Sequence, residues 1–160
     1  MRIKPFQTAI ILLFFVITGC TAIYEDGKEL AADAKRQIEE ITVENLNIII
    51  ESGEEYLLVD VRQPDEFAHG NIPGSVNIPR GELIFKIGNE DYWMEQYMYP
   101  PATDQEIIIY CKAGDRGILE TLELKKIGYI NVNNLKGGYT AFNPDGVTET
   151  TPASSGGCGE

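Results

Sequence analysis

Residues 106–116 read EIIIYCKAGDR, a short apolar run that ends at a cysteine and continues into a glycine-containing loop. A continuous apolar run of this length is typical of a β-strand that is buried on both faces. From Ile118 to Ile127 the apolar residues recur at helical spacing, and Gly128 follows as a natural stop. The pattern predicts a strand, a turn at Cys111 and a helix, the unit from which parallel α/β sheets are built.

The same alternation of strand and helix patterns extends along the chain on both sides of this unit. Residues 56–61 form a second apolar run, residues 43–50 have helical spacing, and residues 129–135 suit a short strand. We therefore expect an α/β domain over residues 41–142, with a central, mainly parallel sheet flanked by helices. Ligands of such sheets bind beyond the carboxyl ends of the strands, and Cys111 stands at one of these ends.

The surroundings of Cys111 favour an anionic sulfur. A helix N-terminus offers unpaired N–H groups and a positive dipole end, and a tight loop can turn successive N–H groups toward one centre. Lys112 and Arg116 add positive charge in an otherwise acidic chain. We therefore interpret Cys111 as a nucleophilic thiolate rather than a buried structural cysteine. The expected anion-binding loop is Lys112, Ala113, Gly114, Asp115 and Arg116.

Three ordered motifs resemble those of the rhodanese family. They are Cys111 followed by four residues and Arg116, the upstream segment LLVDVRQPDEFAHGNIPGSVNIP, and the downstream segment LKGGYTAF. The resemblance implies a three-layer rhodanese-like fold and a sulfurtransferase. Such an enzyme carries sulfur as a persulfide on Cys111 between a small sulfur-containing anion or persulfide donor, such as thiosulfate, and a thiol or cyanide acceptor. It implies no metal and no organic cofactor.

Several residues depart from the family pattern or allow two interpretations. Gly117 stands where many members have Ser or Ala, and His69 precedes Gly70 where the family often has His after the Gly, so we interpret His69 as a turn residue. Arg62 either helps to hold an anion or forms an ion pair with Asp60 that ties adjacent loops together. Residues 84–101 are longer and more aromatic than is usual, and they form either a wall over the site or additional core.

Two competing functions remain open at this point. Cell-cycle phosphatases of the same fold place five residues between Cys and Arg, whereas this loop has four, which suits a group smaller than phosphate. A non-catalytic envelope module for sulfur relay, binding or redox sensing would also fit the sequence. Cys158, in the GGCGE tail, is a possible resolving thiol for a Cys111 persulfide, or an incidental tail cysteine.

The N-terminus carries the features of an export signal. Arg2 and Lys4 precede an apolar run from Ala9 to Ile17, which is too short to span a membrane, and the sequence ITGC then resembles a bacterial lipobox. We expect a lipoprotein signal peptide over residues 1–19, a lipid on Cys20, a tether over residues 20–40 and a flexible tail over residues 143–160. Lipid attachment would place the protein at the cell envelope, on the periplasmic side of the outer membrane in a Gram-negative source.

Charge and residue counts exclude other classes. The net charge of −12 argues against nucleic acid as a partner, because phosphate binding needs a basic face. Three cysteines and a single histidine cannot make a four-ligand zinc site without carboxylates. The same single histidine leaves little scope for a Ser-His-Asp hydrolase.

Overall fold

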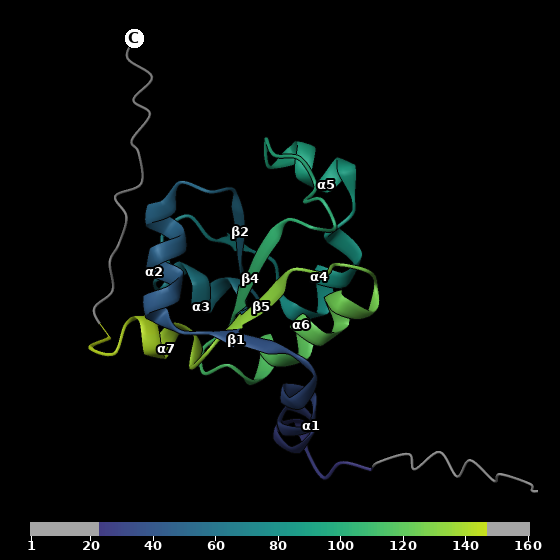
Figure 1. Cartoon of the computed structure of the whole chain (residues 1–160), viewed down its shortest axis with the longest axis vertical. Coiled ribbons are helices and arrows are strands. Elements are labelled where there is room, and N and C mark those ends of the chain that lie inside the picture. The colour runs from purple at the N-terminus through teal and green to yellow at the C-terminus, as the bar shows by residue number, and fades with distance from the viewer. Residues whose placement is uncertain (1–22, 147–160) are drawn as a thin grey trace, which may run out of the picture.

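A five-stranded, fully parallel sheet forms the centre of the computed structural model, which describes residues 23–146 (Figure 1). The strand order is β1-β5-β4-β2-β3, and every neighbouring pair runs in parallel. The strands are β1 (Glu39–Ile41), β2 (Tyr56–Asp60), β3 (Val76–Asn77), β4 (Glu106–Tyr110) and β5 (Val132–Leu135). The two strands predicted from their apolar runs, β2 and β4, lie side by side in the middle of the sheet.

Helices cover both faces of this sheet, which makes the fold three-layered (Figure 1). On one face, α2 and α7 pack against the sheet, and on the other face lie α4 and α6. The helices are α1 (Gly27–Ala34), α2 (Val43–Ser52), α3 (Pro64–Ala68), α4 (Arg80–Lys86), α5 (Glu90–Glu95), α6 (Asp115–Lys126) and α7 (Gly138–Phe142), with a 3-10 turn at Lys35–Gln37. The expected α/β architecture is confirmed.

The continuous apolar runs of β2 and β4 are explained by burial on both faces. Leu57 of β2 and Ile107 of β4 point into one core, beside α4 and α6. Leu58 and Ile108 point into the other core, beside α2. All four side chains are at most 4% exposed, and burial of each contributes about 1.5–3 kcal/mol. Because no face of these strands meets water, their sequences show no polar alternation.

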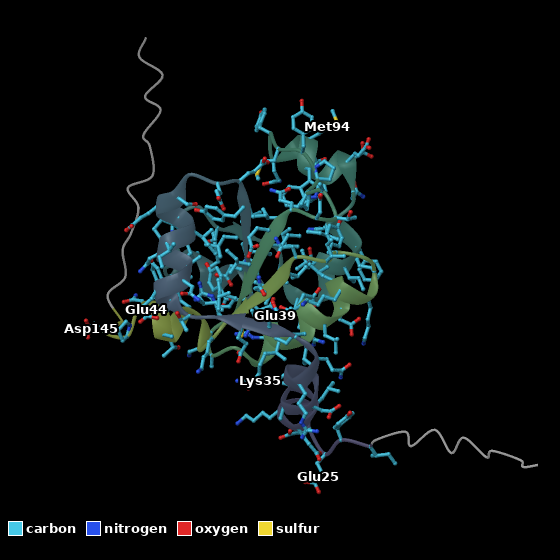
Figure 2. All side chains as sticks on the ribbon, viewed as in Figure 1. Glu25, Lys35, Glu39, Glu44, Met94 and Asp145 are labelled. Carbon is cyan, nitrogen blue, oxygen red and sulfur yellow. The ribbon has the colours of Figure 1, made fainter. Side chains whose placement is uncertain are left out.

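The segment expected to be a tether is partly folded onto the domain. Helix α1 packs its small buried residues Ala31 and Ala34 against Ile118 of α6, and β1 extends the sheet by pairing with β5. Figure 2 shows Lys35 and Glu39 where this segment turns from α1 into the sheet edge. The packed region therefore includes α1 and β1, so the expected tether over residues 20–40 is too long. The sequence concealed this packing because α1 contacts the domain through two small alanines, not through large apolar residues.

Residues 84–101 comprise the end of α4, all of α5 and a loop, and α5 lies at the end of the molecule far from α7 (Figure 1). Trp93 is fully buried in the core beside α4, and its indole N–H donates to the Ile87 carbonyl at 2.8 Å. Met94 marks the exposed side of α5 in Figure 2. Within residues 23–146, no helix is both long and apolar enough to cross a membrane.

Candidate active site

Cys111 follows the last residue of β4 and lies at the carboxyl end of the sheet, as the sequence predicted. The cysteine is free and only 2% exposed. The backbone N–H of Gly114 points back at it, with nitrogen and Sγ 3.1 Å apart. Gly114 directly precedes α6, a helix of twelve residues, so the sulfur lies at the N-terminus of that helix. Such a terminus stabilises negative charge on the sulfur.

The Gly137-Gly138 motif supports the Cys111 loop from behind. The N–H of Tyr139 donates to the Cys111 carbonyl at 2.8 Å, and the N–H of Thr140 donates to the Lys112 carbonyl at 3.0 Å. A β-carbon on Gly138 would lie 2.2 Å from the Cys111 carbonyl oxygen, so only glycine permits this approach. The downstream motif is thus a structural brace for the loop that carries the sulfur.

Arg116 does not stand free at the site but binds a carboxylate. Its guanidinium donates two hydrogen bonds to Glu66, at 2.7 and 2.8 Å. These bonds hold the pKa of the Glu66 carboxyl at about 2, although partial burial opposes the shift. Glu66 raises the pKa of Arg116 in return, and the neighbouring Cys111 sulfur adds to the effect. Arg116 therefore places positive charge near the sulfur while being fixed by α3.

Glu66 was not singled out from the sequence, although it belongs to a recognisable local motif. It lies three residues after Gln63, the N-cap of α3, and the two residues form a capping box. The motif signals a helix start, but nothing local signals a partner fifty residues away.

Arg62 forms the ion pair with Asp60 that is one of the two roles allowed by the sequence, and it also contributes to the wall of the depression beside the Cys111 loop. Its side chain is 4% exposed and binds the fully buried Asp60, with the shortest contact at 2.6 Å. It also donates to the Gly70 carbonyl at 2.7 Å, and its guanidinium carbon lies 4.3 Å from the centre of the Tyr139 ring. Arg62 thus joins the end of β2 to the turn after α3 and to α7.

A depression of about 470 Å³ opens beside the Cys111 loop. Lys112 is exposed at its edge, and Tyr139, Thr140 and Glu66 contribute to its lining. His69 is also exposed at this edge, where it caps α3, in agreement with its interpretation as a turn residue. Ala113 and Asp115 are exposed on the loop.

The alternative of an aromatic wall over the site is wrong. Met98 and Tyr99 line a hollow with Tyr56, at the start of β2 and therefore at the opposite end of the sheet from Cys111. Tyr97 is 99% exposed, whereas Trp93 belongs to the core. The segment lengthens the fold at the end remote from the chemistry.

Four expectations lie partly or wholly outside the described residues. The signal peptide, the lipid on Cys20 and the role of Cys158 all fall there, as does most of the expected tail. Between residues 23 and 146, no group of three or more His, Cys, Asp or Glu side chains is arranged to hold a metal ion.

Comparison with known proteins agrees with the motifs and the fold. The model of the rhodanese-like domain matches residues 42–145. The chain belongs to the rhodanese-like family. A sulfurtransferase of Allochromatium vinosum is 30% identical over 115 residues, which cover 72% of this chain and 97% of that protein.

Two solved structures extend the comparison. The human single-domain sulfurtransferase is 29% identical, with a TM-score of 0.62, over 66% of this chain and 95% of that one. A Rhodopseudomonas palustris protein of unknown function, called a possible tyrosine phosphatase, is 27% identical, with a TM-score of 0.64, over 78% and 94%. This rhodanese-like domain thus has structural neighbours that carry two different activity names.

Proposed function

We propose that this rhodanese-like domain is a sulfurtransferase that carries sulfane sulfur on Cys111. The observation that carries the proposal is the Gly114 N–H directed at Cys111 Sγ, at 3.1 Å, in a loop between a buried strand and a helix N-terminus. This arrangement suits a sulfur that must bear negative charge both as a thiolate and as a persulfide. Relatives named sulfurtransferases support the same activity class.

In the first step, the Cys111 thiolate attacks the outer sulfur of a donor. With thiosulfate, a new S–S bond forms to Cys111, the bond between the two donor sulfurs breaks, and sulfite leaves with the electron pair. The products are an anionic Cys111 persulfide and sulfite, so charge is conserved. Because Cys111 is only 2% exposed, a donor must present its reactive sulfur at a terminal position.

In the second step, an acceptor removes the outer sulfur. Cyanide attacks that sulfur, leaves as thiocyanate, and returns Cys111 to the thiolate; a thiolate acceptor becomes a persulfide in the same way. This is covalent catalysis by an activated nucleophile, and it predicts ping-pong kinetics. The chemistry needs no metal and no organic cofactor.

Phosphate-ester hydrolysis is the competing enzymatic function, because one structural neighbour is called a possible tyrosine phosphatase. Four residues separate Cys111 from Arg116, one fewer than in the cell-cycle phosphatases of this fold. Moreover, Arg116 has both of its terminal nitrogens on Glu66, whereas a phosphate-binding arginine would direct them at the ligand. Both observations favour sulfur over phosphate.

The deciding experiment is intact-mass analysis of the purified protein before and after thiosulfate, beside Cys111→Ser. We expect a gain of one sulfur atom that requires Cys111, is lost on adding cyanide, and matches the thiocyanate released. If thiosulfate fails, glutathione persulfide and polysulfide are tested as donors. Sulfur uptake from none of them, with phosphate released from an aryl phosphate, would replace sulfur transfer by phosphatase activity.

No uptake and no hydrolysis would leave the non-catalytic envelope module for relay, binding or redox sensing. The same experiment tests the proposed role of Cys158 as a resolving thiol. The Cys158 thiol would attack the Cys111 persulfide, form a Cys111–Cys158 disulfide and release hydrosulfide. Peptide mapping of the loaded protein detects that disulfide, and unchanged transfer in Cys158→Ser would exclude a resolving role.

We further propose that the protein is exported and held at the cell envelope by lipid on Cys20. The lipobox-like ITGC sequence supports this anchor, and a membrane is then a partner through lipid alone. Fractionation of cells that make the protein should recover it with membranes. Cys20→Ala should move it out of the membrane fraction, and recovery of both forms in the cytosol would refute the proposal.

A further inference from the structure

We propose that Asn134 is a positioning residue for the Cys111 loop and that Glu40, on the edge strand β1, holds Asn134 in place. The expected effect on persulfide formation rests on the proposed sulfur transfer, but the contacts of Asn134 and the alkylation of Cys111 do not. Glu40 precedes the region matched by the family model, which begins at residue 42. The N-terminal segment would thus complete the support of the site.

Glu40 fixes the orientation of the Asn134 amide. Asn134 is fully buried on β5, next to Glu40 in the register of the β1–β5 pair. Its Nδ2 donates to Glu40 Oε1 at 3.0 Å, and Lys35 Nζ lies 2.6 Å from Glu40 Oε2. A carboxylate only accepts hydrogen bonds, so Nδ2 must face Glu40 and Oδ1 must face the other way. The negative charge makes this hydrogen bond a strong one.

On its other side, the Asn134 amide lies directly behind the Cys111 loop. An ideal β-carbon on Gly117 would lie 2.2 Å from Oδ1, and one on Gly114 would lie 3.8 Å from Nδ2. The same position on Gly117 is 3.7 Å from the Cys111 backbone nitrogen. Asn134 therefore fills the space between β5 and the first turn of α6.

The Oδ1 atom has no hydrogen-bond partner within residues 23–146, although it is buried. Burying an unpaired carbonyl oxygen costs stability, so an asparagine at this position is not explained by stability. We attribute it to positioning of the Cys111 loop, because the amide sets how closely Gly114 and Gly117 approach the sheet. Gly114 supplies the N–H that lies 3.1 Å from Cys111 Sγ.

Loss of this support should slow the chemistry of Cys111 rather than remove the nucleophile. In Asn134→Ala the loop can relax toward β5, which moves the Gly114 N–H away from the sulfur. Misplacement of a reacting group by about 1 Å can cost up to roughly a hundredfold in rate. We expect both Cys111 alkylation and persulfide formation to slow by about tenfold or more. Glu40→Leu, which removes the acceptor without touching the loop, should slow them in the same direction.

The chain offers a matched control one residue away. Asn133 Nδ2 donates to Glu106 Oε1, also at 3.0 Å, but Asn133 points to the opposite face of β5 and Glu106 begins β4 at the end remote from Cys111. Asn133→Ala removes the same kind of hydrogen bond from the same strand. It should lower the melting temperature while leaving the rates of Cys111 alkylation and persulfide formation unchanged.

The experiment measures two rates at Cys111 for the wild type, Asn134→Ala, Glu40→Leu, Glu40→Gln and Asn133→Ala. Alkylation by iodoacetamide is followed by peptide mapping, and persulfide formation from thiosulfate by intact mass. Glu40→Gln keeps an acceptor for Asn134 but loses the charge facing Lys35. Because Lys35 is half exposed, this loss should be small, and both rates should stay within about threefold of the wild type. Thermal melting shows that each variant is folded.

The proposal is overturned if Asn134→Ala alkylates at the wild-type rate, or if Asn133→Ala slows as much as Asn134→Ala. Equal losses in Glu40→Gln and Glu40→Leu would also overturn it, because the hydrogen bond would then be irrelevant. If Asn134→Ala does not fold, the comparison of Glu40→Leu with Glu40→Gln tests the proposal, and a wild-type alkylation rate in Glu40→Leu would overturn it. Wild-type protein that takes up no sulfur would refute the proposed function alone, since alkylation needs no sulfur donor.

Discussion

Asn134 Oδ1 occupies the place where a β-carbon of Gly117 would lie, with only 2.2 Å between the two positions. Gly117 is also the position at which this chain departs from the Ser or Ala that many rhodanese-like proteins carry. The two features belong together, because a buried asparagine on β5 can approach the first turn of α6 only if that turn carries no side chain. The departure seen in the sequence is therefore a packing requirement.

This relationship predicts that Gly117→Ala destabilises the protein by about 1–3 kcal/mol, as overpacking of a core does. Asn134→Ala should relieve the clash, so the double variant Gly117→Ala/Asn134→Ala should be more stable than Gly117→Ala alone. Urea unfolding of the four members of this cycle measures the coupling between the two positions. Strictly additive effects would mean that the two residues do not meet.

The sequence predicted the elements that local pattern determines. β2, β4 and α6 were predicted because their apolar residues follow strand or helix periodicity, and the loop at Cys111 followed from them. It did not predict the Arg116–Glu66 pair or the Asn134–Glu40 bond, which join residues 50 and 94 positions apart. In the sequence alone, polar side chains of this kind are expected to be exposed, because only the topology of the fold brings them into contact.

Residues 21–40 were expected to be a partly helical tether, and the packing of helix α1 against the domain was missed for a related reason. Its contact with α6 relies on Ala31 and Ala34, which bury little area and leave a polar sequence that resembles a tether. Both roles of Arg62 could be stated from the sequence, but its ion pair with Asp60 and its place in the wall of the depression could be seen only in the structure.

Glu66→Gln should destabilise the protein in a pH-dependent manner. The pKa of Glu66 is held at about 2, below its ordinary value of 4.5, so its contribution to stability is complete above about pH 5 and is lost as the pH falls toward 2. At pH 7 we expect a loss of about 1–2 kcal/mol, reduced by solvent because the pair is partly exposed. Urea unfolding at several pH values tests this, with Glu82→Gln, from the exposed Glu82–Lys86 pair, as the control. A pH-independent difference would contradict it.

Glu120→Gln should have the opposite effect. Burial raises the pKa of Glu120 to about 7, although the Arg80 guanidinium, whose Nε is 3.6 Å from the carboxylate, opposes the shift. The unfolded chain ionises this group near 4.5, so the wild type loses stability as the pH rises from about 5 through 7. We expect Glu120→Gln to be more stable than the wild type by about 1–3 kcal/mol at pH 8, with the gain disappearing near pH 5.

Urea unfolding of Glu120→Gln and the wild type at pH 5 and pH 8 measures this difference. Glu51→Gln is the control, because Glu51 is exposed on α2 and does not contribute to the raised pKa of Glu120. Equal pH dependence in the wild type and Glu120→Gln would show that Glu120 ionises normally in the folded protein.

Lys112 should govern the use of anionic donors. Arg62 and Arg116 are each bound to a carboxylate, whereas Lys112 is exposed at the edge of the depression beside Cys111. Lys112→Ala should therefore slow persulfide formation from thiosulfate by about threefold to tenfold at low salt, because a cation near the entrance attracts a dianion. The loss should shrink above about 0.5 M salt, where charges are screened within a few ångströms. Lys126→Ala, at the far end of α6, should leave the rate unchanged, and alkylation of Cys111 by the neutral reagent iodoacetamide should proceed at the wild-type rate in both variants. A salt-independent loss with both thiosulfate and iodoacetamide would show that Lys112 shapes the loop rather than attracting the donor.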